Sequence, residues 1–418
     1  MTGKQASSDA SLRPVLFVAL VTGLCLLGDS ALYALLPSRL EVFAVTPTAA
    51  GLILGVNRYV RILSNNLAAR IFESKGFYGP FMGAVLLSVA TTASYGLFVG
   101  FWPLFMAHCL WGVAWSILRL GGYLAVIESA RGPSIGHLMG VLQSISRGGS
   151  VIAVMIGGLL ADMVGSRQVF VIIALATLAA IPLVPFCGVP RSLGRRSGAP
   201  TTVATEQKQL SIDRRQIWVL YAVAAVAWLV INGLVVATAG YLIRTIVGEG
   251  TLLLGVFVGV GTLTGTLLAM RWLSDLGLSP LFGHASDNVG RSKVITTAMA
   301  VAIVSLALVA LDQSLFVVIP TLGTVFICGT ALFVSLNAAI GTLAAPHRRA
   351  AILGWYTTWA DIGSGTGPVL GFVLITKIGF GWLYGGAALL LALTMSLYLW
   401  TFATSRHKVA PRSRFSRF

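Results

Sequence analysis

The chain has 418 residues, of which 56% are hydrophobic and only 10% are charged, and its formal net charge is +16. No water-soluble domain of ordinary composition has this balance, and the period-two alternation of an outer-membrane barrel is absent. Apolar runs long enough to cross about 30 Å of hydrocarbon recur along the chain, so the sequence predicts an all-α polytopic membrane protein.

Twelve candidate spans follow one another along the chain. The first, 14–37, is predicted to stay in the protein rather than to be cleaved as a signal peptide, because Asp29 lies mid-run and the run ends in Leu36-Pro37. The other spans are predicted at 49–71, 78–98, 102–127, 138–160, 168–188, 217–243, 251–277, 294–311, 315–342, 350–375 and 380–403.

The basic residues are distributed unequally between the connecting segments. With the N-terminus inside, the cytoplasmic segments hold 20 of the 29 lysines and arginines, and the opposite side holds four: Arg39, Arg167, Arg244 and Lys377. This asymmetry predicts that both termini are cytoplasmic in a bacterial inner-membrane protein. The tail sequence RHKVAPRSRF is expected to lie against anionic lipid, and no nucleic-acid partner is expected.

The span pattern divides into two halves. A segment rich in Pro, Gly, Ser and Arg separates them, so we expect a six-helix bundle, a cytoplasmic linker, a second six-helix bundle and a basic tail, at 1–188, 189–216, 217–403 and 404–418. Sliding the sequence by 214 positions aligns 140–165 with 354–379, and four of the six glycines in each segment coincide. Parallel six-helix repeats are typical of transporters that bind substrate between the repeats.

One connecting segment carries a recognisable motif. Gly283-His-Ala-Ser-Asp287-Asn-Val-Gly290-Arg291 matches G-x-x-x-D-x-x-G-R, and with the twelve spans and basic linker it resembles the major facilitator superfamily over nearly the whole chain. The first-half copy keeps only Glu73 and Gly76. The resemblance implies a two-bundle transporter, which we expect to be monomeric. The motif residues are expected to form a breakable cytoplasmic gate centred on Asp287, with a solvated turn as the alternative.

A glycine-rich stretch lies in the eleventh span. Gly363-Ser-Gly-Thr-Gly367-Pro368 resembles the glycine–proline motif that antiporters of this superfamily usually carry in the fifth span. Its different position leaves symport and antiport both open. Gly363, Gly367 and Gly371 recur every four residues, so they are expected to line a helical face that a neighbouring helix approaches closely.

Eight ionisable side chains lie roughly mid-span, and His108 is a weaker ninth. A lone arginine at mid-bilayer costs about 2.5–3.5 kcal/mol on insertion scales, so these groups must face the protein interior or a water-filled cavity. The repeat suggests Arg147–Asp361 and Arg61–Asp275 as pairs, with Arg271–Asp275 as a local alternative. The eight are Asp29, Arg58, Arg61, Arg119, Arg147, Arg271, Asp275 and Asp361.

The five arginines exceed the three aspartates, and this excess has two interpretations. Backbone carbonyls with Asn57, Asn65 and Asn337 can solvate the excess, or an anionic substrate can complete the site. The predicted substrate-binding residues are therefore Asn57, Arg58, Arg61, Arg119, Arg147 and Arg271, with Arg58 foremost because the repeat gives it no partner.

Proton coupling is assigned to the carboxylates. An aspartate near arginine keeps its charge while paired and binds a proton more readily when the pair opens, so Asp29 and Asp361, with Asp275, are the predicted carriers. A permanent salt bridge is the alternative for Asp361. Aromatic residues in the fourth and eleventh spans favour an amphipathic organic substrate over an inorganic ion: Trp111, Trp115, Trp355, Tyr356 and Trp359.

Other functions lack the necessary motifs. No G-x-x-x-x-G-K-[ST] sequence is present, and the four cysteines, in or at the ends of spans, show no paired spacing. Neither an enzyme nor a cofactor is therefore expected. The sequence predicts a proton-coupled secondary transporter, with export favoured. An uptake symporter, a cationic multidrug antiporter and a non-transporting scaffold or receptor remain as alternatives.

Overall fold

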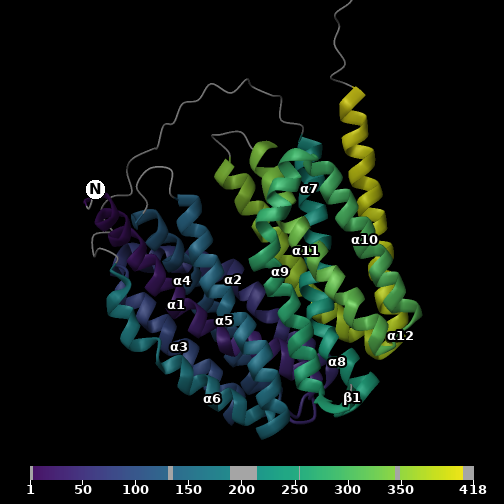
Figure 1. The fold of residues 1–418 in the computed structure, drawn as a ribbon, viewed down its shortest axis with the longest axis horizontal. Helices are drawn as coiled ribbons and strands as arrows, with labels where there is room; N and C mark the ends of the chain where they lie inside the picture. The colour runs from purple at the N-terminus through teal and green to yellow at the C-terminus, as the bar shows by residue number, and fades with distance from the viewer. Residues whose placement is uncertain (1–2, 130–134, 189–213, 254, 344–348, 408–418) are drawn as a thin grey trace, which may run out of the picture.

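The structure is a computed structural model that describes residues 3–129, 135–188, 214–253, 255–343 and 349–407. It is almost entirely helical (Figure 1). The first half contains α1 (Gly3–Ser38), α2 (Pro47–Lys75), α3 (Tyr78–Leu97), α4 (Phe101–Ser129), α5 (Ile135–Val164), α6 (Ser166–Leu178) and the 3₁₀ helix η2 (Ile181–Cys187). The second contains α7 (Arg214–Ala227), the π-helix η4 (Trp228–Val235), α8 (Val236–Val247), β1 (Gly250–Leu253), β2 (Val256–Gly259), α9 (Val260–Asn288), α10 (Arg291–Leu311), α11 (Leu315–Leu343) and α12 (Arg349–His407).

These elements make twelve spans, as the sequence predicts. Helix α6 continues into η2, α7 continues through η4 into α8, and α12 contains two spans that meet at Gly379, where φ is 77°. Within the described residues, nine helices qualify as membrane spans by length and hydropathy alone, with α12 counted once. Helices α2 and α9 are not among the nine, and they carry Arg58, Arg61, Arg271 and Asp275.

The predicted start of the eighth span is wrong. Residues 251–259 were expected to be helical, but Gly250–Leu253 and Val256–Gly259 pair as an antiparallel hairpin, and α9 begins only at Val260. Gly255 turns the chain with φ 80°, which is costly for other residues. The hairpin side chains are apolar, so hydropathy alone does not separate them from the helix that follows.

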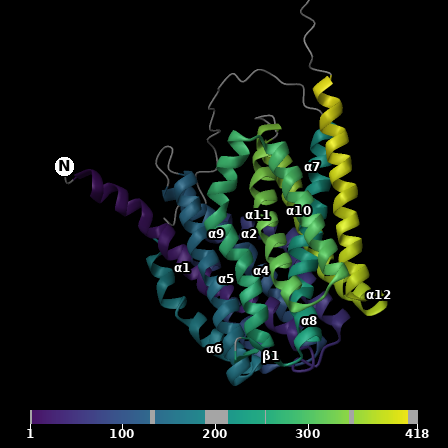
Figure 2. The same ribbon diagram turned by 45° about the vertical axis from the view of Figure 1, so that its right-hand side comes forward.

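The two six-helix bundles lie side by side, α1–α6 against α7–α12 (Figures 1 and 2). Between them α2 packs on α12 and α5 packs on α9. We call the end of the molecule at which η2 ends and α7 begins the linker face, and the end that carries β1 and β2 the hairpin face. Both views place the start of α1 and the end of α12 away from the hairpin face.

Buried apolar residues show where the bundles join. One cluster runs from Leu27–Leu54 of the first bundle into the second bundle, so it is continuous across the interface. A separate cluster, which includes Val15–Leu26 and Ala180–Cys187, is confined to the linker-face part of the first bundle. The bundles therefore share a core toward the hairpin face and separate toward the linker face.

The predicted boundaries of the four chain segments stay a prediction. The linker and tail fall largely outside the described residues, which resume at Arg214 and end at His407.

The predicted glycine face exists. Gly363, Gly367 and Gly371 of α12 lie against α7, η4 and α8, where an added Cβ would meet Ala225, Leu229 and Thr238 respectively. In the first bundle, Gly149 of α5 lies against Gly23 of α1. Each bundle thus packs its fifth span closely on its first through small residues, which supports the internal repeat.

We expect Gly367→Ala to destabilise the protein by about 1–3 kcal/mol, because a Cβ there would lie 2.6 Å from the Cα of Gly233. The matched control is Gly354→Ala in the same helix, where a Cβ meets nothing within 4 Å. That change is expected to stabilise the helix by up to about 1 kcal/mol. Equilibrium unfolding in detergent measures both, and equal effects would contradict the close contact.

Candidate functional site

A cavity of about 690 Å³ lies between the bundles. All eight mid-span ionisable side chains that the sequence singles out line it, as do Asn57, Asn337, Trp111, Trp115 and Tyr356. Trp355 does not; its side chain is 60% exposed on the outer surface. Trp359 packs edge-on against Trp218 instead. The sequence therefore identified the charged lining correctly, but two of the five aromatic residues lie elsewhere.

The cavity extends toward the linker face. Its walls include Gly140 and Gln143 near the start of α5, Pro280 near the end of α9, and Thr357 near the start of α12. These positions lie on the side where the two buried clusters are separate. The structure is thus open between the bundles at the linker face and packed at the hairpin face.

An ion pair joins the bundles in the cavity wall. Nη2 of Arg61 on α2 donates to the carboxylate of Asp361 on α12. Nη1 of Arg58 lies 3.9 Å from the same carboxylate. The Arg61 and Asp361 side chains are only 6% and 14% exposed, so the pair is largely shielded from solvent. Asp361 therefore compensates two guanidinium groups from the opposite bundle.

The predicted pairs Arg147–Asp361 and Arg61–Asp275 are wrong. Both pairs joined positions that the repeat makes equivalent, but the bundles contact each other through α2 with α12 and α5 with α9. A residue of α2 therefore faces α12, whose first span is the repeat equivalent of α5. It does not face α9, which is the repeat equivalent of α2. Arg58 is also not the isolated guanidinium that the repeat indicated, since Asp361 lies near it.

Asp29 of α1 has neutral polar neighbours and forms no ion pair with an arginine among the described residues. Asn57 Nδ2 lies 3.4 Å from its Oδ1, and His108 Nε2 lies 3.9 Å from the same oxygen. The hydroxyl of Tyr95 in turn lies 3.0 Å from His108 Nδ1. Little in the sequence indicates this arrangement, because His108 lies in an apolar run nearly 80 residues after Asp29.

The remaining cavity charges have few ionic partners. Thr330 donates to Asp275 over 2.7 Å, and Arg119 donates to Asn65 over 3.2 Å. The guanidinium of Arg271 lies 5.2 Å from the ring centre of Trp272. Among the described residues, neither Arg147 nor Arg271 forms an ion pair, so the alternative Arg271–Asp275 pair is also absent there. Three cavity arginines, Arg119, Arg147 and Arg271, are therefore left without a carboxylate partner among the described residues.

The motif residues at the linker face make contacts within single bundles. Arg291 donates to the Ala338 carbonyl over 3.0 Å and lies 3.8 Å from Asp287. Gly290 precedes α10 with φ 103°, and Gly76 ends α2 with φ 72°. Gly283 and Asp287 belong to the last turns of α9, not to a loop, and Glu73 belongs to the last turn of α2. Their gating role stays a prediction.

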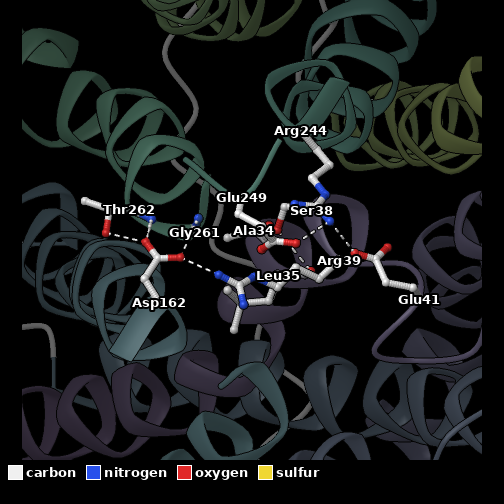
Figure 3. Close-up of polar contacts among 10 residues, drawn as sticks. All are labelled: Ala34, Leu35, Ser38, Arg39, Glu41, Asp162, Arg244, Glu249, Gly261 and Thr262. Atoms are coloured by element: carbon white, nitrogen blue, oxygen red, sulfur yellow. Dashed lines mark hydrogen bonds and ion pairs between the residues drawn. The ribbon is translucent and has the colours of Figure 1, made fainter. Parts of the chain in front are cut away.

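A polar network closes the hairpin face, and sequence reasoning missed it (Figure 3). Asp162 of α5 accepts from the backbone N–H groups of Gly261 and Thr262 over 3.0 and 2.7 Å, and from the Thr262 hydroxyl over 2.6 Å. Arg39 pairs with the same carboxylate over 2.6 Å. Asp162 therefore caps the N-terminus of α9 from the opposite bundle.

A second contact in this network involves Arg244 of α8. It bonds Glu41 of the first bundle over 2.8 Å and Glu249 of its own bundle over 2.5 Å (Figure 3). From the sequence, Arg39 and Arg244 indicate only the topology of the chain in the membrane. The available signal was the presence of acidic residues, Glu41, Asp162 and Glu249, in or beside the same connecting segments.

The sequence model of one protein family, the Major Facilitator Superfamily, matches residues 18–277 and 263–417 of this chain. Two curated relatives are both multidrug resistance protein MdtG. The one from Dickeya zeae is 23% identical over 341 residues, covering 79% of each chain, and the one from Proteus mirabilis is 24% identical over 288 residues, covering 67% of each.

Solved structures show the same fold. A POT family transporter in complex with 5-aminolevulinic acid superposes with a TM-score of 0.75 at 13% identity, over 96% of each chain. A bacterial homolog of the human lysosomal transporter Spinster, in an inward-facing and occupied conformation, gives 0.70 at 14% identity, over 97% of this chain and 98% of that one. The family match and the twelve-helix fold lead to one conclusion: the chain belongs to the Major Facilitator Superfamily and is a multi-pass membrane transporter.

Proposed function

We propose that this transporter is a monomeric, proton-coupled exporter that moves a small organic anion or an amphipathic metabolite across the bacterial inner membrane by alternating access. The observation that carries the proposal is that three cavity arginines lack a carboxylate partner among the described residues: Arg119, which bonds the Asn65 amide, and Arg147 and Arg271. Burying unpaired cations is costly, so a ligand that supplies the missing negative charge is favoured.

Arg147 and Arg271 are well placed to share one ligand. They project from α5 and α9, the helices that pack on each other across the bundle interface, and both line the cavity. A guanidinium group binds carboxylate or phosphate oxygens through two parallel N–H bonds. An anion held by both would contact both bundles, so its binding would be sensitive to their relative position.

The cavity also offers apolar surface for an organic group. Trp111 and Trp115 stack with ring centres 6.2 Å apart, and Trp228 lies edge-on to Tyr356 at 6.4 Å. All four line the cavity. Aromatic walls beside charged groups suit an amphipathic ligand better than a bare inorganic ion.

Two cavity carboxylates support proton coupling. Asp29 is held by neutral groups, and the ion pair of Asp361 with Arg61 crosses the bundle interface, so movement of the bundles would break it. The distribution of basic residues supports a cytoplasmic linker face and cytoplasmic termini. The cavity would then load from the cytoplasm, which fits export, as do the multidrug resistance relatives.

Arg147→Gln and Arg271→Gln are each expected to weaken binding of the recognised anion by roughly 10- to 100-fold, because each removes a charge-assisted hydrogen bond. A thermal-shift screen of aromatic monocarboxylates, dicarboxylates and phosphate monoesters finds the ligand class, and titration calorimetry measures the affinity. Arg167→Gln is the matched control, since Arg167 bonds the carbonyls of Gly96 and Leu97 outside the cavity. Unchanged affinity in both cavity variants would contradict the anion site.

The cationic multidrug antiporter is the second candidate. Asp29 and Asp275 line the cavity without an arginine ion pair among the described residues, and the relatives carry a multidrug resistance name. Proton-gradient-driven transport of tetraphenylphosphonium in proteoliposomes, lost in Asp275→Asn and kept in Arg147→Gln, would favour this candidate. Binding of an anion without counterflow would instead favour a non-transporting receptor.

A further inference from the structure

His108 is a fully buried titratable residue that the proposed transport cycle does not yet use. Its side chain on α4 is 0% exposed, and its ring lies between Tyr95 of α3 and Asp29 of α1. Nδ1 has the Tyr95 hydroxyl at 3.0 Å, whereas Nε2 has no hydrogen-bond partner among the described residues. The carboxylate oxygen nearest to Nε2 in an ion-pair geometry is Oδ1 of Asp29, at 3.9 Å.

The surroundings of His108 define which ring nitrogen carries the proton. If Nδ1–H donated to Tyr95, Nε2 would present a lone pair to the Asp29 carboxylate, which is repulsive. If Tyr95 donates to Nδ1, the proton sits on Nε2 and points toward the carboxylate. A small rotation of the Asp29 side chain would then complete the hydrogen bond and satisfy a buried N–H that is otherwise costly.

The groups around Asp29 differ in kind from those around Asp361. Asp361 is paired with Arg61, whereas Asp29 has Asn57, Trp111 and His108 around its carboxylate, the first two within hydrogen-bonding reach. Charged groups act on Asp29 from farther away: Arg58 and Arg61 of α2 and Arg147 of α5. Tyr33 on α1 and Cys109 on α4 are further titratable neighbours of the cluster. Neutral donors stabilise an ionised carboxylate without locking it in an ion pair, so Asp29 stays able to accept a proton.

We propose that His108 is a positioning residue for the proton site. Held by Tyr95 with its proton on Nε2, the neutral ring donates to ionised Asp29 and thereby sets the pH at which Asp29 takes up a proton. This inference rests on the proposed role of Asp29 in proton coupling. It adds that Tyr95 of α3, acting through His108 of α4, helps to set the pH at which Asp29 of α1 takes up a proton.

The test is an infrared pH titration of the purified transporter in lipid nanodiscs, without substrate. Protonation of a buried carboxyl produces a carbonyl-stretch band, and the band that Asp29→Asn removes belongs to Asp29. The titration midpoint of that band is the readout. A residue with only a packing role would change thermal stability without moving this midpoint.

His108→Phe keeps a ring but removes the donor, so the ionised form of Asp29 loses stabilisation and the midpoint should rise by roughly one to two pH units. His108→Gln retains an N–H donor and should restore part of the shift. Tyr95→Phe removes the hydroxyl that keeps the His108 proton on Nε2, so it should raise the midpoint, but by less than His108→Phe does. Tyr384→Phe is the matched control, because Tyr384 is equally buried and bonds Thr238 over 2.9 Å in the second bundle.

The outcomes separate the two proposals. If Asp29→Asn removes no band, the proton role of Asp29 is wrong. If it removes the band but His108→Phe and Tyr95→Phe leave the midpoint at the wild-type value, the positioning role is wrong and the proton site stands. If His108→Phe does not fold, the shifts of Tyr95→Phe and His108→Gln relative to Tyr384→Phe decide the question.

Discussion

Replacing Asp361 by alanine is expected to lower the free energy of unfolding by about 3–5 kcal/mol, because it leaves the largely buried Arg61 guanidinium without its counter-charge. Arg58 loses its nearest carboxylate at the same time. Two cations held together in a low-dielectric wall repel each other, so the α2–α12 contact should weaken as well. Denaturant titration in detergent, followed by tryptophan fluorescence, measures the change.

Asp275→Ala is the matched control for this experiment. It removes a carboxylate from the same cavity, but the Asp275 carboxylate accepts only the Thr330 hydroxyl in the described structure. Its loss should therefore cost at most about 1.5 kcal/mol. The double variant Asp361→Ala/Arg61→Leu should recover most of the lost stability, since an apolar pair often replaces a buried ion pair at little cost. Equal losses for the two single variants, without recovery in the double, would show that the pair contributes nothing.

Hydropathy and charge placement were enough to predict the architecture. Most of the twelve spans follow from apolar length, with α2 and α9 as the exceptions, and the eight ionisable residues line the cavity because the bilayer leaves them no other place. The free energy of placing a segment in the bilayer depends on the residues of that segment, so these predictions need no knowledge of how helices pack. For the same reason the prediction is wrong at 251–259, where apolar residues form a hairpin instead of a helix.

Which side chains form ion pairs depends on which helices contact each other, and the sequence does not state these contacts directly. The repeat correctly related α2 to α9 and the fifth span to the eleventh, but contact occurs between α2 and α12 and between α5 and α9. Arg61 therefore meets Asp361 and not Asp275. The approach of α2 to α12 is close: a Cβ on Gly365 would lie 3.3 Å from the Gly55 carbonyl oxygen and 3.0 Å from Arg58 Cβ.

The hairpin-face network escaped prediction for a different reason. Asp162 lies near the end of a span, where a carboxylate is ordinarily solvated and uninformative. Two of its partners are backbone N–H groups, those of Gly261 and Thr262, which have no side-chain signature. Only the packing of α5 on α9 turns this residue into a cap for a helix of the other bundle.

Asp162→Asn is expected to shift the transporter toward a state that is open at the hairpin face. The variant loses the ion pair with Arg39 and presents an amide N–H₂ group where the N-terminus of α9 offers only donors. Hydrogen bonds to a charged group contribute about 1.5–3 kcal/mol each, so the ratio of open to closed molecules should rise at least about tenfold. Spin labels at Val164→Cys and Leu252→Cys, in a background without the four native cysteines, report the separation across the two bundles.

Asp312→Asn controls for the chemical change, because Asp312 caps the Ser314 N–H over 2.8 Å within one bundle. Glu41→Gln and Glu249→Gln separate contacts between bundles from contacts within one. Both glutamates pair with Arg244 and are 59% and 67% exposed, but only Glu41 belongs to the opposite bundle. Glu41→Gln should therefore give a small shift toward the open state and Glu249→Gln none. If Asp162→Asn keeps the wild-type distance distribution, the carboxylate does not hold this face closed, and the shared apolar core and the Arg244–Glu41 ion pair do so without it.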